Sequence, residues 1–433
     1  MNVSQETVLD LMNNTEENIF LTGDAGTGKS YVTNKWLSSL DHSKVAVCAP
    51  TGIAALNISG ETLHRMFNIP FSIFDLEYQA TIQSRKMKAT KRRYLQEIES
   101  LLIDEVSMAR SDVMNFVSAS LKVIRESRKP FGGVRLIAVG DPFQLPPVVQ
   151  KHEKDKIPYP WFFQSDSWIS ANPSICNLTE IYRQKDDMEF AEILQRIRWG
   201  RATKADLVKI NKQFSITPGK DKVVVACLNR TVDQINSDNL ARIDSKMYFS
   251  EMEYYNYVDN FDISKNVPAP VELYIKVGAK VMLLSNNSTS DGSWVNGSIG
   301  HIVKIETSAL DPDVIDHVIV RLVEGPEVKV KRTTWKSEES SMGEKGVITT
   351  IMGEATQFPI KLGYAVTVHK SQGMTFSSMH FHCDYLFERG QAYVALSRAM
   401  SLDGLSLSRS LKPYMIMTDP QVIKYMNSKV EKG

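Results

Sequence analysis

The segment GDAGTGKS, from Gly23 to Ser30, constrains the fold of this chain more than any other. It fits G-x-x-x-x-G-K-[S/T], a loop in which backbone N–H groups and the lysine cradle nucleotide phosphates. The apolar residues 19–21 before it predict a buried strand, and residues 31–37 behind it contain no glycine or proline and predict a helix. This order aims a helix N-terminus at an anion. We therefore predict a bound nucleoside triphosphate, with Lys29 on its β- and γ-phosphates and the Ser30 hydroxyl on Mg²⁺; an ordinary glycine-rich turn is the alternative.

The composition excludes several classes of protein. With 433 residues, 42% of them hydrophobic and 23% charged, the chain is typical of a soluble protein of about two to four domains. No apolar run approaches the roughly 18 to 20 residues that span a bilayer, and the acidic N-terminus without arginine predicts neither a signal nor a transit peptide. The 51 basic and 50 acidic residues give a net charge of +1, so any nucleic-acid site must be a local groove. The cysteines lack a C-x-x-C pair, which favours buried thiols in a reducing compartment over zinc or disulfides: Cys48, Cys176, Cys227 and Cys383.

A second apolar strand, 101–103, ends in two carboxylates, Asp104 and Glu105. P-loop enzymes need one acid to hold Mg²⁺ and another to orient or deprotonate the attacking water. We assign Asp104 to the metal and Glu105 to the water. A strand followed by acids is a weak signal alone, but the phosphate loop requires such a partner.

The strand 134–139 leads into GDPFQLPPV, in which prolines and Gly140 fix the shape of the loop. A rigid loop at the strand tips can carry the Gln144 amide to where a γ-phosphate would lie. Pro142 and Phe143 are predicted to face outward, where an aromatic ring can stack on a base. Burial of Phe143 in the core is the alternative.

Polar residues also follow the strand 45–49. Ligands of open α/β sheets sit beyond the carboxyl ends of the strands, so Thr51, Thr62 and His64 are placed to touch one; alternatively they are cap or turn residues. Further along, the basic run 84–93 is either a solvated helix face or a phosphate contact, within an insertion.

The second half repeats the α/β pattern without a second glycine loop. A strand at 223–227 precedes a helix from Val232, and strands at 364–368 and 379–383 precede a helix around 391–399. This half must therefore serve the first nucleotide. Between these parts, 298–359 contains short alternating runs separated by turns, which predicts a small inserted β-barrel.

Seven sequence motifs occur in order and span nearly the whole chain: GDAGTGKS, APTGIAA with TLH, LLIDEVSM, GDPFQLPPV, LTEIYRQ, VTVHKSQGMTF and YVALSRA. These ordered motifs resemble those of the superfamily-one helicases, and within them the petite-integration-frequency type. The segment DVMNFVSASLKVIRES resembles a signature region of that type and favours it over RecD-like and conjugative-relaxase relatives.

The resemblance implies an α/β fold of two RecA-like P-loop domains with parallel sheets, ATP between them, and two small insertions. Motor domain 1A would comprise 1–64 and 98–180, and a wedge or pin subdomain 1B would comprise 65–97. Motor domain 2A would comprise 181–297 and 360–433, and an SH3-like β-barrel 2B would comprise 298–359.

The resemblance also assigns residues to the two ligands. Gln5, otherwise a lone surface glutamine, is similar to the glutamine that reads adenine, and Gln144 to the phosphate sensor. Arg183 and Arg398 are similar to arginines that reach the γ-phosphate from the side of the second domain; a surface ion pair is the alternative for Arg398. The ATP site would be completed by Gly23, Asp24, Ala25, Gly26, Thr27, Gly28, Lys29, Ser30, Gln372 and Gly373. The track for the single strand would be lined by Thr51, Thr62, His64, Pro142, Phe143, His369 and Lys370.

The implied activity is ATP-dependent 5′-to-3′ movement on single-stranded DNA and unwinding of tailed or forked duplex DNA. Resolution of G-quadruplex DNA is common in the resembled type, although no residue of this chain argues for it. The chain starts almost at the motor, so we expect a bacterial or phage cytoplasmic protein that is monomeric without DNA. The alternatives are an RNA or dual-specificity helicase, a RecD-like translocase that unwinds only within a larger complex, and a small-molecule P-loop kinase, which would not explain HKSQG or SRA.

Overall fold

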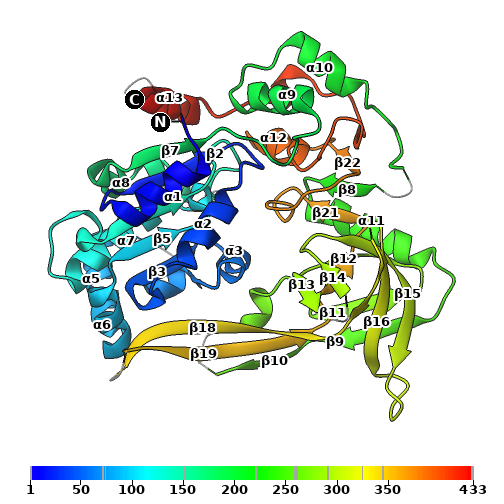
Figure 1. Ribbon diagram of the computed structural model, residues 1–433, viewed down its shortest axis with the longest axis horizontal. Coiled ribbons are helices and arrows are strands. Elements are labelled where there is room, and N and C mark those ends of the chain that lie inside the picture. The colour runs from blue at the N-terminus through cyan, green and yellow to red at the C-terminus, as the bar shows by residue number, and fades with distance from the viewer. Residues whose placement is uncertain are drawn as a thin grey trace. The chain divides into compact units, whose positions relative to one another are not determined.

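The computed structural model describes residues 2–70, 73, 75–150, 153–219, 222–257, 262–289, 292–323, 325–343 and 346–430. The chain divides into two compact units, and many of their elements are labelled in Figure 1. The first unit comprises 1–183, 337–352 and 418–433, and the second comprises 184–336 and 353–417. The sequence predicts a boundary at residue 180 and assigns all later residues to the second half of the molecule, whereas 337–352 and 418–433 belong to the first unit.

The first unit is built on a parallel sheet of seven strands in the order β1-β7-β2-β6-β5-β3-β4. All residues of β2 and β5 are buried, as expected for a parallel sheet covered by helices on both faces. The predicted strands at 19–21, 45–49, 101–103 and 134–139 are confirmed, whereas β1, β4 and β7 were not predicted. The strands are β1 (Asn2–Val3), β2 (Ile19–Gly23), β3 (Val45–Ala49), β4 (Glu61–Thr62), β5 (Ser100–Ile103), β6 (Arg135–Val139) and β7 (Ser174–Leu178).

Amphipathic helices bury their apolar faces on this sheet. Val8 of α1 and Trp36 of α2 pack with Leu21 of β2 in one core cluster. The apolar face of α7, which includes Phe116 and Leu121, is fully buried. The helices of this unit are α1 (Gln5–Asn14), α2 (Lys29–Leu37), α3 (Gly52–Asn57), α4 (Leu63–Met66), α5 (Leu76–Lys86), α6 (Ala89–Glu97), α7 (Ser111–Ile124), α8 (Asp166–Ala171) and α13 (Pro420–Val430).

The basic insertion folds as the helices α5 and α6, and one of its lysines is buried. The Lys91 Nζ lies 3.1 Å from Glu61 Oε2 and 2.7 Å from Glu339 Oε1. Glu339 belongs to the part of strand β18 (Thr333–Gly343) that joins the first unit, and the Ser340 N–H donates to Glu61 Oε1 over 3.2 Å. At Lys91 neither expectation for the basic run holds, since this ammonium is neither solvated nor available to a phosphate in this structure.

The C-terminal helix α13 packs on the first unit, so the predicted extension of the second motor domain to residue 433 is wrong. The Trp168 Nε1 donates to the Tyr425 hydroxyl over 3.0 Å. The rings of Phe163 and Tyr425 stack at 4.3 Å between centroids and 6° between planes. Aromatic packing of this kind ties the end of the chain to the unit that contains the phosphate loop.

The second unit contains a four-stranded parallel sheet in the order β21-β8-β22-β23. Its strands are β8 (Val223–Ala226), β21 (Ala365–Thr367), β22 (Met379–His382) and β23 (Leu405–Leu407), and its helices are α9 (Met188–Arg198), α10 (Lys204–Asn211), α11 (Asn229–Ala241) and α12 (Gln391–Leu396). Every residue of α12 is buried. The strands and helices predicted around this sheet are confirmed, and the two parallel sheets together make the chain an α/β protein.

The inserted segment is antiparallel, as its alternating pattern predicts, but its bounds are wider than predicted. The five-stranded sheet β17-β16-β15-β12-β20 recruits strands on both sides of 298–359, because β12 pairs with β15 and with β20. Its strands are β12 (Lys280–Leu283), β15 (Ile299–Thr307), β16 (Ile315–Leu322), β17 (Glu327–Val330) and β20 (Ile360–Leu362). Smaller ladders are formed by β9 (Met247–Glu251) with β11 (Glu272–Lys276) and by β13 (Asn287–Thr289) with β14 (Gly292–Trp294).

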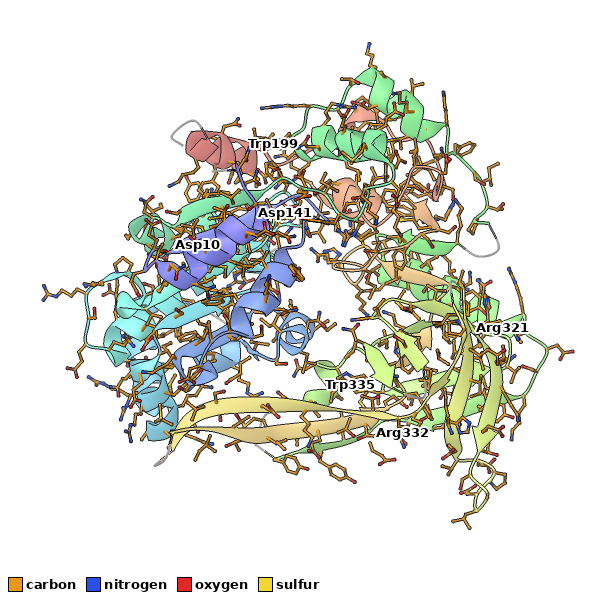
Figure 2. All side chains as sticks on the ribbon, in the orientation of Figure 1. Asp10, Asp141, Trp199, Arg321, Arg332 and Trp335 are labelled. Carbon is orange, nitrogen blue, oxygen red and sulfur yellow. The ribbon has the colours of Figure 1, made fainter. Side chains whose placement is uncertain are left out.

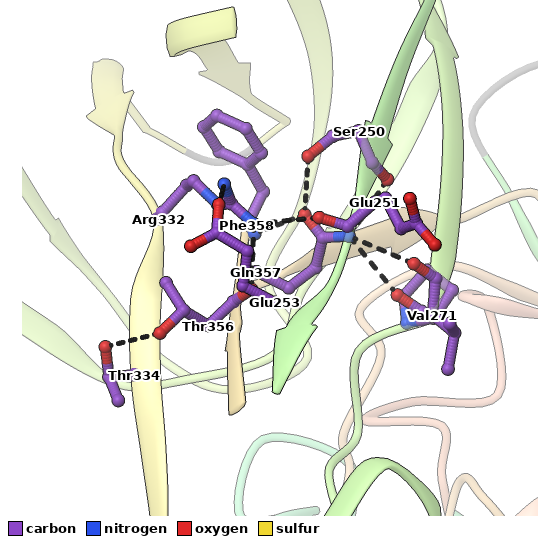
Figure 3. Close-up of polar contacts among 10 residues, drawn as sticks. Ser250, Glu251, Glu253, Val271, Arg332, Thr334, Thr356, Gln357 and Phe358 are labelled. Atoms are coloured by element: carbon purple, nitrogen blue, oxygen red, sulfur yellow. Dashed lines mark hydrogen bonds and ion pairs between the residues drawn. The ribbon is translucent and has the colours of Figure 1, made fainter. Parts of the chain in front are cut away.

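A long ladder, β10-β19-β18, extends from this sheet and was not predicted. It consists of β18 with β19 (Gly346–Gln357) and β10 (Glu253–Asn256). A fully buried amide fixes its base, because Gln357 Oε1 accepts from the Ser250 hydroxyl over 2.8 Å and Gln357 Nε2 donates to the Ser250 carbonyl over 3.0 Å (Figure 3). Arg332 adds bonds of 2.8 Å to the Glu251 carbonyl and 2.9 Å to the Thr356 carbonyl.

Cys48, Cys176, Cys227 and Cys383 are all buried free thiols, as predicted. In the described ranges, no helix combines the length and the apolarity that crossing a membrane requires.

The buried His380 of β22 predicts acid sensitivity. Burial, with help from His382 and Lys222, lowers the pKa of the His380 imidazole to about 4. An unfolded histidine titrates near 6.5, so stability is full above that pH and is lost as the pH falls towards 4. Urea titrations between pH 7 and pH 4 should show that His380→Gln removes about 3 kcal/mol of this pH dependence. His317→Gln, at a partly exposed position of β16, should retain this pH dependence of the unfolding free energy. Equal pH dependence in the two variants would contradict its assignment to His380.

Candidate active site

The loop between β2 and α2 takes its shape from glycines. Gly26 and Gly28 have φ of +87° and +85°, a left-handed backbone that other residues rarely adopt. Lys29 begins α2 and turns back over the loop, so that its Nζ lies 3.0 Å from the carbonyl oxygens of Gly23 and of Asp24. The start of α2 and the loop amides thus form a concave site suited to an anion.

Two predicted residues from outside the loop pack against it. The Gln5 Nε2 donates to the Thr27 carbonyl over 3.0 Å, and a Cβ at position 28 would lie 2.2 Å from this nitrogen. A Cβ at Gly26 would lie 2.5 Å from the Arg183 Cβ. Close packing therefore requires glycine at both positions, and the alternative of a lone surface glutamine at position 5 is wrong.

The two predicted acids follow β5. The Asp104 Oδ1 accepts from the Glu105 N–H over 2.9 Å. Burial raises the pKa of the Asp104 carboxyl, while that N–H and the positive charge of Lys29 oppose the shift. Glu105 has φ of +48°, and non-glycine residues held in this region cost about 1–3 kcal/mol and cluster at functional sites. Ser30 is exposed on α2.

The GDPFQ loop turns inward, so the prediction that Pro142 and Phe143 face outward is wrong. Both are buried, and Phe143 is 2% exposed. The cause is Asp141, a fully buried carboxylate labelled in Figure 2: its Oδ1 accepts from the Phe143 N–H over 3.2 Å, and its Oδ2 lies 3.4 Å from Gln144 Nε2. Sequence reasoning missed Asp141 as the residue that orients Gln144, although its place between the strand end and Gln144 was an available signal.

The residues predicted on the single-strand track of the first unit have local roles as well. The hydroxyl of Thr51 caps α3 by accepting from the Ala54 N–H over 3.3 Å, and the hydroxyl of Thr62 caps α4 in the same way over 3.3 Å to Arg65. His64 is exposed on α4 and lines a pocket of about 260 Å³.

In the second unit, Arg398 joins two of the motifs. Its Nη1 lies 3.4 Å from the carbonyl oxygens of Ser371 and Met374, in the loop that follows HK. Its Nε donates to the Val394 carbonyl over 2.9 Å, and its Nη2 donates to the Ser397 hydroxyl over 2.8 Å. Arg398 is 1% exposed, so the alternative of a surface ion pair is wrong.

Gln184 is a second residue that sequence reasoning missed. Its buried Nε2 donates to the carbonyl of Ala399 over 2.8 Å and lies 3.4 Å from that of Ser397, so it brackets Arg398. Its position in LTEIYRQ, directly after Arg183, was the available signal. The other predicted residues of this unit lie in the loop after β21, namely His369, Lys370, Gln372 and Gly373.

The first unit holds a glycine loop between a buried strand and a helix, an acid pair at the tip of β5 and a positioned glutamine. These features define it as the nucleotide-binding unit of a P-loop nucleoside triphosphatase. A family model described as PIF1-like helicase matches residues 1–207. The ATP-dependent DNA helicase Pif1 of Bdellovibrio bacteriovorus is 32% identical over 97% of this chain and 90% of that protein. Human PIF1 is 33% identical over 94% of this chain and 61% of that protein.

Solved structures agree with this relationship. A Pif1 structure from a Bacteroides species, in complex with ADP-AlF4, aligns with a TM-score of 0.87 and 30% identity over 99% of this chain and 97% of that chain. A Bacteroides Pif1 complex with ADP-AlF3 and ssDNA has a TM-score of 0.67 and 30% identity, with the same coverage. A structure described as DNA unwinding at forked dsDNA by two coordinating Pif1 helicases has a TM-score of 0.67 and 30% identity, over 100% of this chain and 98% of that chain.

The chain belongs to the PIF1-like helicase family, as the resemblance of its motifs predicts. It is an ATP-dependent DNA helicase, and therefore an ATPase.

The contact between Gly26 and Arg183 predicts the effect of a single methyl group. Gly26→Ala should displace the loop, because φ of +87° strains alanine and its Cβ would meet Arg183 at 2.5 Å. We expect ATP to bind about tenfold more weakly or worse, measured with a fluorescent ATP analogue. Gly219→Ala is the matched control, since its nearest contact would be an ordinary 3.6 Å. Unchanged binding by Gly26→Ala would contradict the assigned loop geometry.

Proposed function

We propose that this helicase moves 5′ to 3′ on single-stranded DNA and unwinds tailed or forked duplex DNA, with G-quadruplex DNA as a further substrate. The observation that carries the proposal is the phosphate loop of the first unit, with Gln5 and Arg183 packed on it. The relatives crystallised with ssDNA and described with forked dsDNA support the choice of substrate. Polarity and quadruplex resolution rest on the resemblance of the motifs.

Within the proposed site, ATP is held by residues of the first unit. Lys29 binds the β- and γ-phosphates in place of its present carbonyl partners, Gln5 reads adenine, and Glu105 orients the attacking water. The exposed Ser30 hydroxyl and the Asp104 carboxylate are oxygen ligands of the kind that Mg²⁺ prefers. When bound, Mg²⁺ would neutralise charge on the phosphates.

Arg398 is proposed to act on the γ-phosphate from the second unit, together with Gln372 and Gly373. A ligand shifts a conformational equilibrium only by its differential affinity for the two states. ATP has a γ-phosphate for Lys29 and Arg398 to share, whereas ADP does not, and this difference drives one step along the strand.

The strand contacts are proposed at Thr51, Thr62, His64, His369 and Lys370. The Phe143 ring is buried, so it offers no face on which a base could stack. The segment β15–β17 is proposed to belong to an SH3-like barrel, and α5 with α6 to a wedge that separates the strands. Four buried free thiols favour a reducing compartment, which supports a cytoplasmic location.

Strand displacement tests the proposed function directly. Duplexes with a 5′ tail, a 3′ tail or no tail are compared with and without ATP. We expect ATP-dependent unwinding of the 5′-tailed substrate alone, and none by Lys29→Ala, which loses the phosphate contact. Unwinding of the 3′-tailed substrate would contradict the polarity, and translocation without unwinding by the purified chain would favour a RecD-like translocase.

The proposed roles of Arg398 and Glu105 predict separable defects. Arg398→Ala should reduce DNA-stimulated ATP hydrolysis by about 10³–10⁵, the range measured for arginine fingers, while ATP still binds. Glu105→Gln should bind ATP and DNA without hydrolysis. Arg409→Ala, an exposed arginine in the same unit, is the control. Because Arg398 bonds to loop carbonyls, the thermal midpoint of its variant must be checked; a folded Arg398→Ala protein with normal turnover removes the assignment.

A further inference from the structure

The second unit holds a pocket of about 510 Å³ between α11, the β9–β11 ladder and the β20–β21 segment; α11, β9, β11 and β21 are labelled in Figure 1. Its walls are largely apolar and include Val232, Leu240, Leu273 and Val366. Small-molecule sites have volumes of about 300–1,000 Å³ and are lined mainly by apolar side chains with a few placed polar groups. The pocket therefore has the size and lining of a site for one small organic group.

One wall of the pocket is held rigidly. The Asn236 Nδ2 donates to the Ala365 carbonyl over 3.1 Å, and the Asn236 Oδ1 accepts from the Ala365 N–H over 2.9 Å. These two bonds tie α11 to β21, so the pocket is formed before any ligand enters and little ordering entropy is lost on binding.

The polar lining of the pocket favours an anion. Lys361 and Lys370 both line it, and in the part of the chain that the structure describes the Lys361 ammonium has no ion-pair or hydrogen-bond partner. Burial and the charge of Lys370 lower the pKa of Lys361 to about 8. Asn229 also lines the pocket and is the first residue of α11. The N-terminus of this helix has no side-chain cap, so it favours a negatively charged group nearby. Two carboxylates, Asp233 and Glu272, also line the pocket, and both are exposed.

We propose that this pocket receives one nucleotide of the bound single strand, with its phosphate on Lys361 and Lys370 and its base among the apolar walls. The proposal rests on the proposed function, because it requires that a strand be bound. A phosphate would offset the repulsion between the two ammonium groups, and a base would fill an apolar space that water occupies poorly. Lys370 lies in the HKSQG motif already assigned to the strand, so the pocket adjoins the proposed track. A free mononucleotide carries the same chemistry, and the experiments below separate the two sources.

The first measurement is oligonucleotide affinity. A fluorescent thymidine oligonucleotide of about eight residues is titrated against Lys361→Met, Lys361→Arg and Lys212→Met. Lys212 is exposed in the second unit outside the pocket, so its variant removes the same charge without touching the site. We expect Lys361→Met to bind about tenfold more weakly and the slope of log Kd against log salt to fall by about 0.7, as for one lost phosphate contact. Lys361→Arg should recover part of the affinity.

The second measurement tests the base. Oligonucleotides with an abasic residue at each position in turn should show a loss of about tenfold at one position in the parent protein, within the range of single-base contacts. Ser237→Phe places a ring in the pocket from an exposed position on α11, and this variant should no longer distinguish the abasic oligonucleotide.

The third measurement needs no variant and so is independent of misfolding. Pyridoxal phosphate is an aldehyde with a phosphate group, and its imines with lysines can be trapped by borohydride and mapped by mass spectrometry. At pH 8 we expect Lys361 to be labelled faster than Lys212, because a pKa of about 8 leaves much of its amine neutral. The oligonucleotide should protect Lys361, whereas thymidine monophosphate should require a far higher concentration.

The outcomes separate this inference from the proposed function. If the parent protein does not bind or unwind DNA, the proposed function fails. If it binds and unwinds normally while Lys361→Met and Ser237→Phe behave like Lys212→Met, only the pocket assignment fails. Equal protection of Lys361 by the mononucleotide and the oligonucleotide would also overturn it, in favour of a site for free nucleotides.

Discussion

The contact between the Lys29 ammonium and the carbonyl oxygens of Gly23 and Asp24 is the interaction on which the site depends. It satisfies a cation that is close enough to influence the pKa of Asp104, and it holds the loop in a curved shape suited to an anion. Gly26 and Gly28 adopt the left-handed backbone of this curve with little strain. Because these glycines have no side chains, Arg183 and Gln5 can approach them closely. The loop is therefore preorganised, so binding a triphosphate exchanges hydrogen-bond partners rather than rebuilding the backbone.

The chain passes from the first unit to the second between two adjacent residues that serve the two halves of the proposed chemistry. Arg183 packs on Gly26 of the phosphate loop, and Gln184 donates to the carbonyls on either side of Arg398. These adjacent residues therefore connect the packing around the phosphate loop to the packing around Arg398 through a single peptide bond.

Charge in this protein is local rather than global. A net charge of +1 leaves no field to attract DNA over long distances, and several cations are already satisfied inside the fold. Lys91 is buried between two carboxylates, whereas Lys361 lines a largely apolar pocket and has no ion-pair partner among the described residues. In the sequence, both lysines have polar or mixed neighbours. Only the contacts in the folded protein distinguish Lys91, a structural cation, from Lys361, a candidate ligand-binding residue.

The two parallel sheets, the phosphate loop and the acid pair could be predicted from the sequence, because neighbours along the chain specify continuous apolar runs, glycine loops and strand-tip acids. It could not predict the β18–β19 ladder, the packing of α13 on the first unit, or the inward turn of Phe143. Those features depend on partners distant in sequence or on one buried carboxylate, Asp141, whose effect on the loop has no periodic signature. Likewise HKSQG and SRA are recognisable as motifs, but nothing in the sequence predicts the contacts from Arg398 to Ser371 and Met374. They form because the fold brings together segments that are distant along the chain.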